Sequence, residues 1–108
     1  MAQLTPDNHD RASRVEAGEF TAAAQSGEWF PIREAANAAI AGSFTGSCRL
    51  EISFDGGDTV IPVTDGAGEV RLFAAPERVI VDEIEPGVLL RWHCVARSTG
   101  TIAHRISR

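Results

Sequence analysis

The fold is decided by residues 48–58, CRLEISFDGGD. Apolar side chains at Cys48, Leu50, Ile52 and Phe54 alternate with polar ones, and a period of two places the two kinds on opposite faces of a β-strand. The strand is followed by a turn sequence whose glycines can adopt the positive φ of a tight hairpin; its residues are Asp55, Gly56, Gly57 and Asp58. This stretch therefore predicts an antiparallel hairpin with one face in a hydrophobic core.

Short apolar strands and turn residues continue beyond this hairpin. A return strand is expected at residues 59–63, and further strands at 69–74, 78–84, 88–97 and 101–107. Pro86 and Gly87 suit the second and third positions of a type II turn. Turns repeated at roughly 8–12 residues are typical of an antiparallel sandwich. We predict an all-β fold, an antiparallel β-sandwich of seven to eight strands, immunoglobulin-like or jelly-roll-like.

Residues 33–42, REAANAAIAG, allow two interpretations. The alanines favour a helix, and Gly42 could end it. As a strand, the segment would place Ala36, Ala38 and Ile40 on one face. A single short helix is marginal on its own, so we predict a strand here.

The length of 108 residues is that of one domain, with 44% apolar and 23% charged residues. Residues 1–15 carry charges and a proline but no apolar period. We expect a flexible N-terminal arm at 1–15 and a single sandwich domain at 16–108.

The charge composition excludes several classes of function. All basic residues are arginine, because lysine is absent, so there is no phosphate-binding GxxxxGK[ST] loop and no lysine nucleophile. A net charge of -5 opposes nucleic-acid binding, which needs a basic surface. No apolar run approaches the roughly 20 residues of a membrane span, and the polar opening lacks a signal-peptide core. We expect neither a nucleic-acid nor a membrane partner, and synthesis in the cytoplasm.

Several motifs also occur in a recognisable order. They are GSFTG at 42–46, SFDGG at 53–57, EIEPG at 83–87, Arg91 with Cys94, and STGT at 98–101. In order and spacing they resemble a group of small phage and prophage virion proteins built as β-sandwiches, over residues 20–107. The chain departs from that pattern at Val60, where tryptophan is frequent, and at His104, where an aromatic residue is common.

The resemblance implies a structural protein of the virion that is assembled in the host cytoplasm and has no catalytic residues. The expected role is a capsid decoration or cement protein that binds the outside of the head, with the major capsid protein or another virion protein as partner. Threefold sites of capsid lattices suggest a homo-oligomer, in the form of a trimer. The alternative is a tail or fibre adhesion module that binds a host glycan or protein.

Two segments are candidates for partner contacts. The arm offers mixed charges that suit a protein surface, at Asp7, Asp10, Arg11 and Arg14. Trp29 and Phe30, followed by Pro31, form an apolar stretch close to the arm. This stretch is either a docking patch or an edge of the core.

An enzymatic function is not predicted. Residues 53–59, SFDGGDT, resemble one Asp-box of the sialidase-like propellers, but a propeller repeats this hairpin in every blade. No nucleophile, base and orienting residue can be assembled from the motifs, and no cofactor is expected.

The remaining polar and sulfur-containing residues favour structural roles. Cys48 and Cys94 could form a bridge between the sheets, but buried free thiols are expected in a cytoplasmic assembly. CxxC and HxxxH spacings are missing, so no metal site is predicted, and His104 is interpreted as a core or edge histidine. The acids Asp82, Glu83 and Glu85 could hold calcium, but such a run is usually a solvated rim. An exposed cross-strand charge ladder is expected from Arg49, Glu51 and Arg91.

Overall fold

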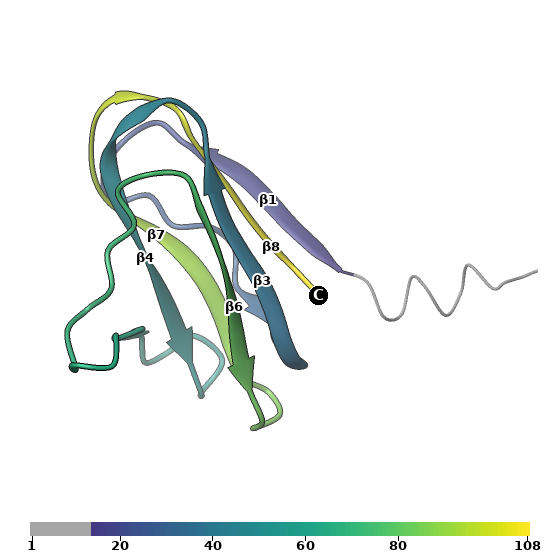
Figure 1. Cartoon of the computed structure of the whole chain (residues 1–108). Helices are drawn as coiled ribbons and strands as arrows, with labels where there is room; N and C mark the ends of the chain where they lie inside the picture. The colour runs from purple at the N-terminus through teal and green to yellow at the C-terminus, as the bar shows by residue number, and fades with distance from the viewer. Residues whose placement is uncertain (1–13) are drawn as a thin grey trace, which may run out of the picture.

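The computed structural model describes residues 14–108, which form eight strands and no helix. In chain order the strands are β1 (Val15–Phe20), β2 (Phe30–Pro31), β3 (Glu34–Ala41), β4 (Phe44–Ser53), β5 (Ile61–Pro62), β6 (Glu77–Glu83), β7 (Leu89–Gly100) and β8 (Ile102–Ser107). They pair antiparallel in two four-stranded sheets, ordered β1-β8-β3-β6 and β2-β7-β4-β5 (Figure 1). The all-β fold and the antiparallel β-sandwich predicted from the sequence are therefore confirmed.

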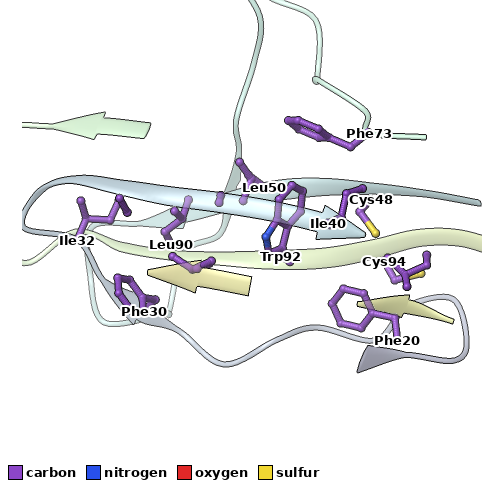
Figure 2. Close-up of a cluster of buried hydrophobic side chains, with 14 of the residues drawn as sticks. Phe20, Phe30, Ile32, Ile40, Cys48, Leu50, Phe73, Leu90, Trp92 and Cys94 are labelled. Carbon is purple, nitrogen blue, oxygen red and sulfur yellow. The ribbon is translucent and has the colours of Figure 1, made fainter. Parts of the chain in front are cut away.

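The core lies between the two sheets and is filled by alternate residues of the longer strands (Figure 2). Trp92 of β7 is at its centre and has no exposed surface. Its indole packs edge-on against the ring of Phe73, with 5.0 Å between the ring centres. Its Nε1–H donates a hydrogen bond to the carbonyl oxygen of Arg105 at 3.2 Å. A buried indole is stable when its single donor has a partner, so Trp92 links the core to the backbone of the opposite sheet.

Residues 34–41 form strand β3, so the strand interpretation of this segment is correct. Ala36, Ala38 and Ile40 point into the core and are nearly or fully buried. β3 lies between β8 and β6. Pairing on both sides satisfies its backbone groups, which outweighs the helix propensity of its alanines.

The turns from β3 to β4 and from β7 to β8 lie together at one end of the sandwich (Figure 1). Gly100 has φ +81°, and a Cβ there would lie 2.1 Å from the carbonyl oxygen of Ser43. Only glycine allows so close a backbone approach at a positive φ. Two of the motifs singled out in the sequence, GSFTG and STGT, therefore meet at this contact.

Three expectations for the strands were wrong. Residues 69–74 form no strand, because they pair only through single bridges at Val70 and Phe73. The return strand after the 55–58 turn shrinks to β5, since Pro62 has no N–H to extend a ladder. The first strand, β1, begins at Val15, inside the segment predicted to be an arm; residues 1–13 of that segment lie outside the described residues.

Candidate interaction surfaces

The residues predicted to contact a partner do not form one surface in the structure. Asp7, Asp10 and Arg11 lie outside the described residues. Arg14 is exposed, and its backbone N–H and carbonyl pair with Arg108 at 3.0 and 2.9 Å. Phe30 is only 1% exposed and belongs to the core, so the docking-patch interpretation is wrong for this residue.

Trp29 is half-buried and fixed from two sides. The guanidinium carbon of Arg91 lies 4.3 Å from the centre of its ring, a cation–π arrangement. On the other side, a Cβ built on Gly57 would lie 2.8 Å from the indole Nε1. Trp29 therefore packs between Arg91 and the 55–58 turn, so its indole is not available as a docking patch for a partner.

The charge ladder exists, but its centre is buried. The carboxylate of Glu51 accepts hydrogen bonds from Nε of Arg91 at 2.8 Å and from Nε of Arg49 at 2.9 Å, and its side chain is only 2% exposed. Burial by itself would raise the pKa of Glu51, but the hydrogen bonds from Arg91 and Arg49 outweigh it and lower the pKa. The expected exposed ladder is therefore corrected to a buried carboxylate held between two arginines.

The hairpin residues around Asp55 form a connected set of hydrogen bonds. The Asp55 carboxylate accepts from the Ser53 hydroxyl and from the Thr59 N–H, both at 2.8 Å. Ser53 in turn accepts from the N–H of Gly57 at 2.8 Å. Bonds from Thr59 and then from Ser53 lower the pKa of Asp55 to about 2. Gly56 and Gly57 have φ +76° and +103°, as the hairpin requires.

The acidic residues considered for calcium do not converge. Asp82 is exposed on the outer face of β6, whereas the carboxylate of Glu83 accepts from the N–H of Glu85 at 3.1 Å. Among residues 14–108, no group of three His, Cys, Asp or Glu side chains is placed to hold a metal ion.

His104 is a core histidine with an unusual environment. It is 5% exposed and stacks on Phe20 at 4.1 Å between ring centres. Gly18 and Gly27 leave the space that its ring fills, since a Cβ at either would lie 2.9 to 3.0 Å from it. Burial lowers the pKa of His104. Nothing in the sequence near His104 indicates that glycines far along the chain surround it.

The outer face of the sheet β1-β8-β3-β6 is the surface with the clearest potential for binding. Strand pairing places Ala103 of β8 beside Ala41 of β3 on this face, and it places Arg105 of β8 between Ala17 of β1 and Ala39 of β3. We call this surface the alanine face; its small residues are Ala17, Ala35, Ala39, Ala41 and Ala103. All five are exposed or half-buried.

Longer side chains lie within and beside the alanine face. Arg105 and Arg78 flank Ala39 in register on β8 and β6. Ile80, also on β6, is 61% exposed. Four of the alanines line a shallow apolar hollow that extends from β1 to β3. Small side chains let the backbone of a partner approach closely, and the arginines can pair with acidic groups of that partner.

Sequence reasoning did not identify this face. The alanines are visible in residues 33–42, but their outward row becomes a surface only when β8 and β1 are placed beside β3. No protein-family model, curated protein or solved structure matches the chain in comparisons with known proteins. No helix in the described part of the chain is long and apolar enough to cross a membrane.

Proposed function

We propose that this chain is a structural protein of a phage virion that decorates the outside of the capsid, with the major capsid protein as its partner. The proposal is supported by the resemblance of residues 20–107 to small virion sandwich proteins, and by the sandwich fold that the resemblance implied. Four of the motifs that carry the resemblance lie at or beside turns of this fold, and Arg91 and Cys94 lie within strand β7.

The alanine face is the observation that carries the proposal. It is the outer surface of one sheet, where exposed or half-buried alanines of β1, β8 and β3 lie beside the side chains of Arg105 and Arg78. A sheet surface that combines small apolar side chains with arginines is suited to packing against another protein. On a shell, many copies would bind at equivalent sites, so a modest affinity of each contact would give high occupancy once neighbouring copies touch.

A binding experiment with one matched pair of variants tests the proposal. Ala39→Glu places a carboxylate in the centre of the alanine face, where Arg78 and Arg105 flank it and allow the domain to fold. Val95→Glu introduces the same side chain at an exposed position of β7, in the other sheet. Each purified protein is mixed with undecorated particles and its occupancy is measured after sedimentation.

We expect Ala39→Glu to weaken binding at least about tenfold, because the partner must desolvate the new carboxylate. Val95→Glu should bind like the unchanged chain. Equal binding of all three proteins would contradict a role for the alanine face. Binding of the unchanged chain to tails, and not to shells, would favour the adhesion module.

A second variant tests the contribution of the N-terminal segment. Removal of residues 1–13 retains Arg14 and its pairing with Arg108. If the charges of Asp7, Asp10 and Arg11 contact the shell, the shortened chain should melt at an unchanged temperature but occupy fewer sites. Full occupancy at unchanged affinity would assign attachment to the sandwich alone.

A further inference from the structure

Cys48 and Cys94 are direct partners on neighbouring strands of one sheet. The register of β4 and β7 places Cys48 opposite Cys94. Both are free cysteines with no exposed surface, and Figure 2 shows them at one end of the core cluster near Phe20. Because both cysteines lie in the same sheet, they cannot form the disulfide between the two sheets that was considered from the sequence.

The backbone around the pair has the geometry of a non-hydrogen-bonded site. The N–H and the carbonyl of Cys48 both bond to Phe73, at 2.9 and 2.8 Å. Those of Cys94 bond to Gln25 and Ala24, both at 2.8 Å. The main-chain groups of each cysteine thus point away from the other cysteine. In such pairs the Cα atoms lie about 4.5 Å apart, which is within the range of about 4.4–6.8 Å that a disulfide spans.

We propose that Cys48 and Cys94 are an oxidisable pair that forms a cross-strand disulfide within the folded sandwich. The observation behind it is the direct opposition of two buried thiols on paired strands. The inference concerns the chain itself and does not depend on the proposed function. A chain made in a reducing compartment and used in an oxidising medium would gain this bond after folding.

The oxidant is a small-molecule disulfide such as oxidised glutathione. A thiolate of the pair attacks it, forming a mixed disulfide and releasing one small thiol. The thiolate of the other cysteine then displaces the second small thiol and closes the protein disulfide. Two protein thiols and one small disulfide become one protein disulfide and two small thiols, so electrons and protons balance.

Reaction in the closed sandwich should be slow. Burial raises the pKa of Cys48 to about 12, and the neighbouring Cys94 adds to this effect. Burial also raises the pKa of Cys94. Few thiolates are therefore present near neutral pH, and an oxidant reaches them only when the sheets separate locally.

The experiment lets the chain refold from urea in buffers of reduced and oxidised glutathione, so that access to the thiols is not limiting. Peptide mapping without reductant identifies the linkage, and thermal unfolding compares the oxidised and reduced proteins. We expect a monomer that has lost the mass of two hydrogen atoms, linked between Cys48 and Cys94. Its melting temperature should be higher by roughly 10 °C, because the bond closes a long loop of the unfolded chain.

Cys48→Ala and Cys94→Ala are the matched controls, since each retains one thiol of the pair. Neither variant should gain stability on oxidation. The proposal is overturned if the refolded chain keeps both thiols, carries glutathione on them, or links them only between molecules. A disulfide that leaves the melting temperature unchanged or lowers it would also overturn it, because the native positions would then not suit the bond.

Discussion

Replacement of Gly57 by valine should reduce the free energy of unfolding by about 3 kcal/mol. Two effects combine at this position. Gly57 has φ +103°, where a residue with a Cβ is strained by about 1–2 kcal/mol. The new Cβ would also lie 2.8 Å from Nε1 of Trp29, and overpacking of this kind costs about 1–3 kcal/mol.

Gly56→Val is the matched control for this substitution. Gly56 also has a positive φ, +76°, but no atom lies within 4 Å of its Cβ position. Gly56→Val should therefore reduce the free energy of unfolding only by the backbone strain at positive φ, about 1–2 kcal/mol. The difference between the two variants isolates the collision with Trp29.

Urea denaturation followed by circular dichroism gives the free energies of unfolding, and tryptophan fluorescence reports on the displaced indole. Equal losses of unfolding free energy in the two valine variants would show that Trp29 does not pack against the turn, contrary to the contact at Gly57. An unchanged urea midpoint for Gly57→Val would also contradict the positive φ of Gly57.

Two further predictions concern charged groups. Arg91→Met should destabilise the domain by about 2 kcal/mol in urea unfolding, since it leaves the buried Glu51 with Arg49 alone; a loss below about 0.5 kcal/mol, typical of an exposed pair, would contradict the burial. The lowered pKa of Asp55 means that its contribution to stability is complete above about pH 4 and is lost as the pH falls toward 2. Asp55→Asn should therefore flatten the acid side of the profile of stability against pH; an unchanged profile would contradict the hydrogen bonds of Asp55 in the turn.

The strands with a clear period of two could be predicted from the sequence because one of their faces is buried. Ile102, His104 and Ile106 share the inner face of β8, as a spacing of two residues in a strand predicts. The same rule fails for the outer face of β4. Ser53 and Glu51 are buried there, since hydrogen-bonded groups of the turn and of β7 cover them. These partners are distant in sequence or depend on turn geometry, so a local pattern cannot reveal them.

β1 was missed for a related reason. Its inward positions are Glu16, Gly18 and Phe20, the residues that pair with the inward positions of β8. Gly18 has no side chain because the His104 ring fills the space beside it, and the carboxylate of Glu16 lies 3.8 Å from Nδ1 of the same histidine. Where side chains of a neighbouring strand fill the space below a strand, that strand needs no large apolar residues and its sequence shows no apolar alternation. The alanine face likewise depends on strand order, which the sequence pattern does not encode.

The most direct test of the proposed function is an averaged electron cryomicroscopy map of phage particles produced by the cells whose genome encodes this chain. We expect density for the sandwich on the outer surface of the shell, at repeated lattice positions, with the alanine face turned toward a neighbouring virion protein. Density for the chain only in the tail, or particles whose purified preparations lack the chain altogether, would contradict a capsid decoration protein.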